Sequence, residues 1–281
     1  MPPGDLIVRD LQYQLGSVLM GLNTPYIISN VNGLDVESVR TSDIANDAEG
    51  GDIPGLDLPE HRLIDFDLAI DDELSADNLS SLIDDLATYF NPSIPGVENY
   101  ISHDFAFQFR NRPKMYIPVR GRRITGVKDS LYHRGAGRFA LQLYSPNKDV
   151  FEVEEQLEDL SLADSVHSTS KMFGVGGTYY ARPVLEIEGP CRNPRITHTE
   201  TDRAIRIDID IASSETLVID VRDKTVKLEG VNVYSNVRSD NEWWVLLPDQ
   251  NNQLTFSRST TGLDGATSTL SVKWHNTRQI L

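Results

Sequence analysis

The sequence predicts a mainly β protein with one clear helix. Short apolar runs separated by glycine, proline and other turn residues recur along nearly all of the 281 residues, a pattern typical of antiparallel sheets. Apolar side chains recur at helical spacing most clearly within residues 75–90. A chain of this length buries a substantial core and more often forms two domains than one.

The first seventy residues predict short strands and a long loop. The runs in Leu6–Val39 are interrupted by glycine and proline, which predicts small strands joined by tight turns. Residues 40–63 carry many acidic side chains among glycines and prolines, which predicts a long mobile loop. Apolar and polar residues alternate over Arg62–Ile70, which predicts a strand.

The predicted helix follows this strand. Ser75 stands where an N-cap residue belongs, and the apolar positions of 76–90 lie on one helical face with acidic residues opposite. Asn91-Pro92 ends the pattern, because a residue before proline avoids the helical conformation. We therefore expect a helix that docks on the sheet with one face.

Residues 101–150, here called the basic segment, predict several strands. Apolar residues alternate in Phe105–Phe109 and in Phe139–Leu143, and Met115–Val119 and Ile124–Val127 lie between them. The prolines and glycines around these runs predict turns.

A domain boundary is predicted after the basic segment. Residues 156–163 are acidic and residues 164–177 are rich in serine and glycine. We therefore expect an N-terminal domain at 1–163, a linker at 164–177 and a C-terminal domain at 178–281. The glycines of Phe173–Gly177 favour a hinge over a phosphate-binding loop, because neither a Lys-Ser/Thr pair nor a helical pattern follows.

The C-terminal domain predicts a sandwich or jelly roll of antiparallel strands. Isoleucines alternate with polar residues over Ile205–Ile211, which predicts one half-buried strand. Thr216–Val221 and Thr225–Glu229 flank a polar turn as in a hairpin. The remaining predicted strands are Val231–Tyr234, Trp243–Leu247, Leu254–Ser257 and Leu270–Trp274.

Composition excludes several classes of protein. The single cysteine, Cys191, rules out an internal disulfide framework and fits a reducing compartment. No apolar run is long enough to span a bilayer and the N-terminus has no signal-peptide pattern, so we expect no membrane anchor. A formal net charge of −16 argues against general affinity for nucleic acid.

Charge is sharply segregated along the chain. The basic segment holds ten Lys/Arg against three Asp/Glu, whereas residues 1–100 hold three against nineteen. Such a basic patch with tyrosines suits single-stranded nucleic acid, but contact with the acidic part of the same or another copy is the favoured interpretation. The candidate contact residues are Arg112, Tyr116, Arg120, Arg122, Arg123, Tyr132, Arg134 and Arg138.

Catalytic and metal-binding patterns are weak. The six histidines are scattered without metal-ligand spacing, and Asp208 and Asp210 most simply face solvent on a strand. No motif joins Cys191 to His198 as nucleophile and base. With 42 acidic residues, paired carboxylates for glycoside hydrolysis are not distinctive. We expect no catalytic residue, metal or cofactor.

A carbohydrate-binding β-sandwich is the alternative function. Trp243-Trp244 offers aromatic rings on which a sugar could stack, although alternation places one ring in the core and the other at the surface.

Motifs in both halves carry a resemblance to a known family. Asn111–Tyr116, Val119–Ile124 and Tyr132–Phe139 resemble the N-terminal domain of siphophage distal tail proteins, particularly those of actinobacterial phages. Leu141–Lys148 stands where those proteins usually carry an alanine-aspartate-proline run, so the local turn is expected to differ. The C-terminal half is similar to the same family through Ala181–Pro190, Asn193–Ile196, Thr216–Asp220, Thr225–Val226, Gly230, Trp244–Pro248 and Val272–Trp274.

The resemblance implies a structural role without catalysis. It implies an N-terminal split-barrel-like domain that forms a ring, usually a hexamer, and a C-terminal galectin-like β-sandwich. The implied partners are the major tail tube protein and the tail-associated proteins of the tail tip. The implied location is the tail tip of a virion assembled in the host cytoplasm, with genome DNA passing through the ring without specific binding.

Charge fits this implied assembly at two points. A closed ring needs heterologous interfaces, where a basic patch of one copy meets an acidic patch of the next. A channel that passes DNA should repel phosphate, so some acids of residues 35–73 are expected to line it or to meet a partner. The candidates are Asp43, Asp47, Glu49, Asp52 and Asp57.

Overall fold

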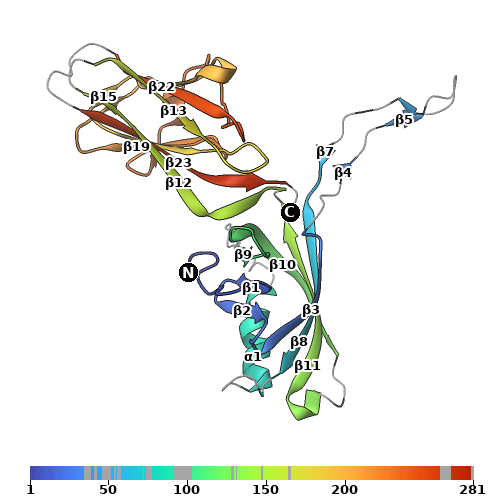
Figure 1. Cartoon of the computed structure of the whole chain (residues 1–281). Helices are drawn as coiled ribbons and strands as arrows, with labels where there is room; N and C mark the ends of the chain where they lie inside the picture. Colours follow the sequence, from blue (N-terminus) through green and yellow to red (C-terminus); the bar gives the residue numbers. More distant parts are fainter. Residues whose placement is uncertain are drawn as a thin grey trace. The chain divides into compact units, whose positions relative to one another are not determined.

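The chain forms two compact units. The computed structural model describes residues 1–34, 39–40, 43–45, 52–53, 55, 58–71, 73, 78–90, 103–127, 130, 132–146, 148–163, 166–259 and 267–279. Met1–Val153 and Gln279 belong to the N-terminal unit, and Glu154–Arg278 form the C-terminal unit (Figure 1). No helix within these described ranges is long and apolar enough to cross a membrane.

The N-terminal unit contains two antiparallel sheets that share strand β10 (Met115–Val127). The first has the order β2 (Val18–Gly21), β1 (Gln12–Leu15), β9 (His103–Phe107), β10 and β12 (Val150–Leu162). The second has the order β10, β11 (Ala136–Ser145), β8 (Arg62–Asp71) and β3 (Tyr26–Asn32). Because β10 belongs to both sheets, their inner faces enclose one core.

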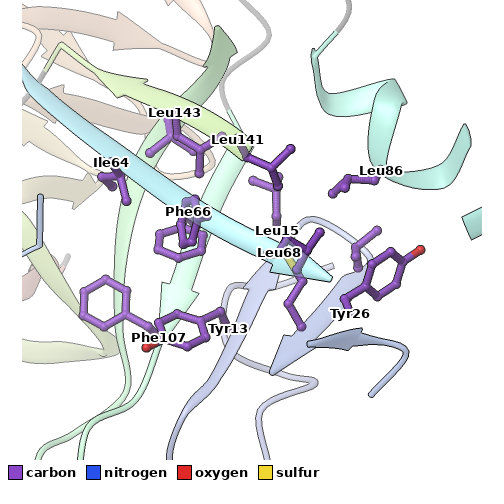
Figure 2. Packing of buried hydrophobic residues seen from close by; sticks show 14 of the residues in the cluster. Tyr13, Leu15, Tyr26, Ile64, Phe66, Leu68, Leu86, Phe107, Leu141 and Leu143 are labelled. Carbon is purple, nitrogen blue, oxygen red and sulfur yellow. The ribbon is translucent and has the colours of Figure 1, made fainter. Parts of the chain in front are cut away.

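Aromatic and aliphatic side chains of both sheets fill this core. Figure 2 shows Phe66 of β8 near Tyr13 of β1, and it shows Leu141 and Leu143 of β11 beside strand β8. The rings of Tyr13 and Phe66 meet edge to face with centroids 6.4 Å apart, a favoured geometry for aromatic pairs. Phe105 of β9 is fully buried beside them. The strict alternation of buried and exposed residues in β8 follows from this core.

Strand β10 is longer than the sequence predicts. Met115–Val119 and Ile124–Val127 are parts of one strand and not two, joined through a β-bulge between Gly121 and Arg123. Pro118 is tolerated inside the strand because β12 pairs only with Met115 and Tyr116, so at Pro118 one side of β10 has no neighbour that requires its missing N–H.

The docked helix is confirmed, with a different start. Helix α1 spans Leu79–Ala87, and Asn78 is its N-cap, because the Asn78 side chain accepts a hydrogen bond from Ser81 N. The predicted cap Ser75 lies outside the described residues. The 3-10 turn η2 (Thr88–Phe90) continues the helix, and the Tyr26 hydroxyl on β3 donates to Leu82 O at 2.9 Å.

The predicted loop at 40–63 contains paired strands. β4 (Val39–Arg40) pairs with β7 (Leu58–Pro59), and β5 (Ile44–Ala45) pairs with β6 (Asp52–Ile53). The prediction of a loop without secondary structure is therefore wrong for these residues (Figure 1). The prediction rested on composition alone, and composition does not exclude short antiparallel strand pairs, because these satisfy backbone groups without a buried core.

The C-terminal unit is a β-sandwich. One sheet has the order β12, β23 (Ser268–Arg278), β14 (Val184–Glu188), β19 (Thr216–Asp220), β20 (Thr225–Leu228) and β21 (Val231–Asn232). The other has the order β13 (Ser168–Gly174), β22 (Asn251–Ser257), β16 (Arg195–His198) and β17 (Arg203–Arg206). β15 (Cys191–Arg192) pairs with β18 (Asp210–Ile211). Inward residues of both sheets form one apolar cluster.

Three sequence predictions in this unit need correction. Ile205–Ile211 is not one strand: β17 ends at Arg206 and β18 begins at Asp210, although the isoleucines do point inward as predicted. Trp243–Leu247 forms no strand, only a bridge between Leu246 and Ala181. The segment predicted as a linker contains β13, which pairs with β22 from Ser168 to Gly174. Burial of Phe173 against Trp274 outweighs the local glycine content there.

A buried arginine ties together distant parts of the N-terminal unit. Arg62, 2% exposed, starts β8. Its guanidinium donates to the carbonyl oxygens of Gly33 (3.2 Å), Leu34 (2.6 Å), Lys148 (3.2 Å) and Gln279 (3.0 Å). Carbonyls buried without a donor are costly, so one side chain satisfies backbone groups from three separate segments.

We predict that Arg62→Leu lowers the free energy of unfolding by about 3 kcal/mol, because it leaves several buried carbonyls without donors. Urea denaturation followed by circular dichroism measures the change. The control is Arg110→Leu, at an exposed arginine of the same unit, where the expected change is within about 0.5 kcal/mol. Equal urea midpoints for the two variants would contradict this role of Arg62.

Candidate functional site

The solvent-facing side of the sheet β3-β8-β11-β10 gathers charged side chains. Register places Asp65 beside Gln142, Asp67 beside Ala140 and Ala69 beside Arg138 on adjacent strands β8 and β11. Asp65, Asp67 and Arg138 are exposed. This face is therefore polar and charged, whereas the opposite face of the same sheet forms the core.

The bulge in β10 turns Arg123 toward the face that already carries Arg120. Arg120 pairs with Tyr144 and Arg123 pairs with Gln142, while Arg122 is the extra residue between them. Without the bulge, Arg123 would share the inward face of Gly121, because strand side chains alternate. The bulge thus brings Arg123 to the surface beside Arg120, and both Arg122 and Arg123 are exposed.

Tyr144 organises this arginine cluster, defined as Arg120, Arg122 and Arg123. The guanidinium carbons of Arg120 and Arg122 lie 4.5 and 4.0 Å from the centroid of the Tyr144 ring, within the range of cation–π attraction. Arg123 Nε donates to Thr125 Oγ1 at 2.9 Å. Sequence analysis missed Tyr144, although its position opposite the basic run on a paired strand follows once the register is known.

Two members of the arginine cluster, Arg122 and Arg123, have no acid partner among the described residues. Arg122, Arg123 and Arg138 form no ion pair with any residue that the structure describes. The nearest acids across the strands, Asp67 and Asp71, are diagonal to Arg138, a separation of about 7–8 Å in a sheet. The positive charge of Arg122, Arg123 and Arg138 therefore remains available to a partner.

The other predicted contact residues lie elsewhere in the N-terminal unit. Arg112 is exposed in the turn before β10, and Arg134 is exposed in the turn η3 (Tyr132–Arg134) before β11. Tyr116 packs against Phe151, with ring centroids 5.3 Å apart. Tyr132 is half-buried against the core. The eight predicted residues thus do not form a single patch.

The predicted acidic residues are only partly described. Asp43 is exposed, and its Oδ1 accepts a hydrogen bond from Gly55 N at 2.8 Å. Asp52 lies in β6, and its side chain is outside the described part. Asp47, Glu49 and Asp57 also lie outside the described residues.

Cys191 and His198 do not form a nucleophile and base. Cys191 is buried, and burial raises the pKa of its thiol to about 12, against the opposing effects of the Arg258 charge and the Ser268 hydroxyl. A thiol with such a pKa holds almost no thiolate near neutral pH. His198 is also fully buried.

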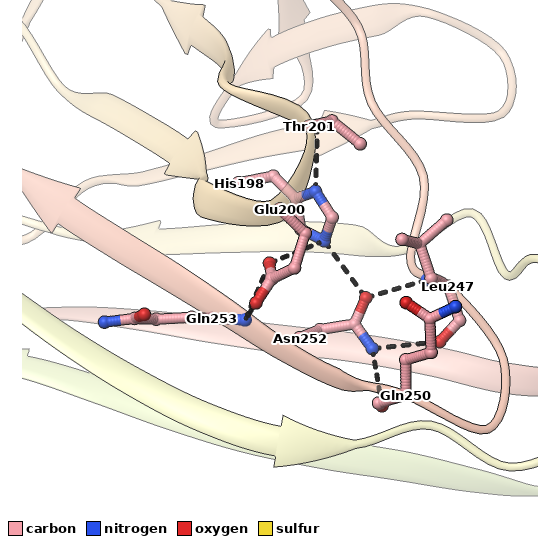
Figure 3. A network of polar contacts seen from close by, with 7 residues as sticks. All are labelled: His198, Glu200, Thr201, Leu247, Gln250, Asn252 and Gln253. Atoms are coloured by element: carbon pink, nitrogen blue, oxygen red, sulfur yellow. Dashed lines mark hydrogen bonds and ion pairs between the residues drawn. The ribbon is translucent and has the colours of Figure 1, made fainter.

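Figure 3 shows that both ring nitrogens of His198 are occupied. Asn252 Nδ2 donates to Leu247 O and Asn252 Oδ1 accepts from Leu247 N, which fixes the orientation of the Asn252 amide. His198 Nε2 therefore donates to Asn252 Oδ1 at 3.0 Å, with Glu200 Oε2 3.4 Å away, and Nδ1 shares a hydrogen bond of 2.9 Å with the Thr201 hydroxyl. The imidazole holds two strands together and has no free nitrogen for proton transfer.

The tryptophan pair offers no two-ring sugar platform. Trp244 is 1% exposed and stacks on His198 with centroids 5.4 Å apart. Trp243 is half-buried against the same core. The expectation that one ring faces the core is therefore confirmed. Among the described residues, no group of three His, Cys, Asp or Glu side chains is placed to hold a metal ion.

Comparisons with known proteins identify the fold. Residues 176–275 match the family model of the siphovirus-type tail component, C-terminal domain. The crystal structure of SPP1 Dit, described as a paradigm of the hub adsorption apparatus in Gram-positive infecting phages, is similar with a TM-score of 0.66 and 12% identity, covering 93% of this chain and 97% of that chain. Comparison with curated proteins gives no match.

A second solved structure has the same fold. A chain of the phage P2 baseplate, in its activated conformation with calcium, is similar with a TM-score of 0.51 and 10% identity, covering 93% of this chain and 97% of that chain. Together these findings confirm the predicted fold class and the resemblance to siphovirus distal tail proteins.

The low reactivity expected of the buried Cys191 thiol can be tested directly. We predict that native Cys191 does not react with a chromogenic disulfide reagent at mildly alkaline pH, because a pKa raised from 9.0 to about 12 reduces the thiolate fraction about a thousandfold. In guanidinium chloride one thiol per chain should react. Cys191→Ser reports the background, and rapid labelling of the native protein would show that the thiol is reactive after all.

Proposed function

We propose that this chain, whose C-terminal domain matches a siphovirus-type tail component, is a structural protein of the distal tail and has no catalytic role. Copies assemble as a closed ring, with six as the expected number, between the tail tube and the tail-tip proteins. The ring assembles in the host cytoplasm and becomes part of the virion tail tip. The similarity of fold to SPP1 Dit over 93% of the chain supports this proposal.

One observation carries the proposed contact between copies. The arginine cluster lies exposed on a sheet face, and Arg122 and Arg123 have no acid partner among the described residues. A heterologous ring interface joins two different patches of the same chain. A basic patch of one copy against an acidic patch of the next also fixes orientation and excludes wrong pairings.

The proposed ring leaves a channel through which genome DNA passes without specific binding. Acidic side chains of residues 35–73, including the exposed Asp43, line this channel and repel phosphate. A cryo-electron microscopy map of the assembled ring tests this placement. A channel wall with a net positive potential would overturn it.

A carbohydrate-binding role has less support than the ring. Its proposed aromatic site is divided, because Trp244 is buried against His198. Sugar binding commonly uses an exposed aromatic face, and only Trp243 retains partial exposure. Absence of carbohydrate binding by the full chain is the result that we expect.

We predict that the double reversal Arg122→Glu and Arg123→Glu weakens assembly by about tenfold or more, because like charges then meet across the interface. Mass photometry of the purified full chain over a concentration series measures the population of rings. The wild-type chain should give a ring mass, and the variant should give smaller species at the same concentration.

The control reverses two exposed lysines of the C-terminal hairpin, Lys224→Glu and Lys227→Glu. This variant has the same change in net charge and should assemble like the wild type. If the Arg122/Arg123 variant assembles equally well, the arginine cluster does not lie between copies. If the wild type stays monomeric at every concentration, the ring proposal itself fails.

A further inference from the structure

Two arginines face each other on the surface of the C-terminal sandwich. Arg195 of β16 and Arg206 of β17 are directly paired in the antiparallel register. Side chains in such positions lie on the same face with Cβ atoms about 4.5–5.5 Å apart, and like charges there repel. The repulsion costs stability unless an anion lies between or beside the two guanidiniums.

A third arginine joins this pair. The segment after η5 (Tyr234–Asn236) runs along the edge of β17, since Asp208 N donates to Asn236 O and Arg238 N donates to Arg206 O. Arg238 thereby lines the same pocket as Arg195 and Arg206. The pocket has a volume of ≈ 360 Å³, and its remaining polar lining is Asn193 and Asp208.

Two carboxylates pair with Arg206 and Arg238, and neither of them pairs with Arg195. Asp240 binds two guanidiniums at once: its Oδ2 pairs with Arg206 Nη1 and its Oδ1 accepts from Arg238 Nε at 3.0 Å. Despite the desolvation that opposes it, the hydrogen bonds from Arg238 and Arg206 lower the pKa of the Asp240 carboxyl. Asp208 reaches Arg238 only at 3.9 Å. Three cations thus meet two anions.

Hydrogen-bonding capacity is also left over in this cluster. Arg195 is exposed and forms no ion pair within the described part of the chain. The buried Nε of Arg206 has no hydrogen-bond partner among the described residues. The neighbouring Arg192 does not contribute, because Asp210 binds it through two hydrogen bonds of 2.8 Å.

We propose that Arg195, Arg206 and Arg238 form an oxyanion-binding pocket that takes a phosphoryl group. Guanidinium N–H groups bind phosphate oxygens in pairs with matched geometry. A phosphoryl group presents at least three oxygens in a tetrahedral arrangement, which suits a pocket lined by three arginines from two strands and a loop. A carboxylate offers only two oxygens in a plane, so it leaves one arginine without an acceptor.

The test uses the purified full chain and inorganic phosphate. Isothermal titration calorimetry at constant ionic strength, with chloride as the replaced anion, measures the dissociation constant. Arg195→Gln should weaken phosphate binding by about tenfold, which corresponds to one lost charge-assisted hydrogen bond. The matched control is Arg203→Gln, at an exposed arginine of the paired strand β17 that does not line the pocket. This variant should bind phosphate like the wild type.

A second variant changes affinity in the opposite direction. Asp240→Asn removes a negative charge that competes for Arg206 and Arg238, and should tighten phosphate binding by about threefold or more. A gain of affinity is not produced by partial unfolding, which circular dichroism checks for each variant. Unchanged affinity in both Arg195→Gln and Asp240→Asn would overturn the pocket.

Three further ligands test whether the pocket prefers a phosphoryl group. Glycerol phosphate should bind at the same site as inorganic phosphate, because the proposed pocket recognises the phosphoryl group alone. Equal binding of glycerol phosphate and phosphate supports the proposal. Acetate that binds as tightly as phosphate would overturn the preference for a phosphoryl group. Chloride that binds as tightly as phosphate would show that the site is only a region of positive charge.

Discussion

Strand β10 has to serve two sheets, and the way it turns between them determines the surface of the N-terminal unit. Val119 and Ile124 both contribute to the core, although five positions separate them and a regular strand would place them on opposite faces. The bulge at Arg122 corrects this parity. Gly121 stands at the turn, where an added Cβ would lie 2.3 Å from Tyr89 O. No larger residue fits between β10 and η2 without moving one of them.

The same bulge makes the charged face. By restoring Ile124 to the core it turns Arg123 outward beside Arg120. The guanidiniums of Arg120 and Arg122 lie over the ring of Tyr144 on β11. Core packing and surface charge are therefore coupled, because a β10 without the bulge would bury Arg123 or expose Ile124. The alternation of β8 adds Asp65 and Asp67 to the same sheet face for the same reason of parity.

Strands with alternating apolar and polar residues could be located from the sequence, whereas their partner strands could not. Alternation correctly located β8, the β19–β20 hairpin and the last strands β22 and β23. It divided β10 in two, because the bulge at Arg122 shifts the alternation between Val119 and Ile124. It also merged β17 with β18, since inward isoleucines continue across a change of partner strand. In the candidate site, the arginines were evident from charge, but Tyr144 becomes their partner only through register.

The two arginine groups differ in what surrounds them, and this difference decides what each can bind. The cluster on β10 lies on a broad, open sheet face, rests on an aromatic ring and spreads its charge along a strand. Such a surface suits another extended protein surface of opposite charge. Arg195, Arg206 and Arg238 instead converge on a pocket, and Asp240 holds two of them in fixed positions. Fixed donors lose little entropy on binding, so they favour a compact anion over a flexible acidic segment. The charge is of the same sign at both places, so the proposed difference, a subunit contact for one and a small ligand for the other, follows from geometry alone.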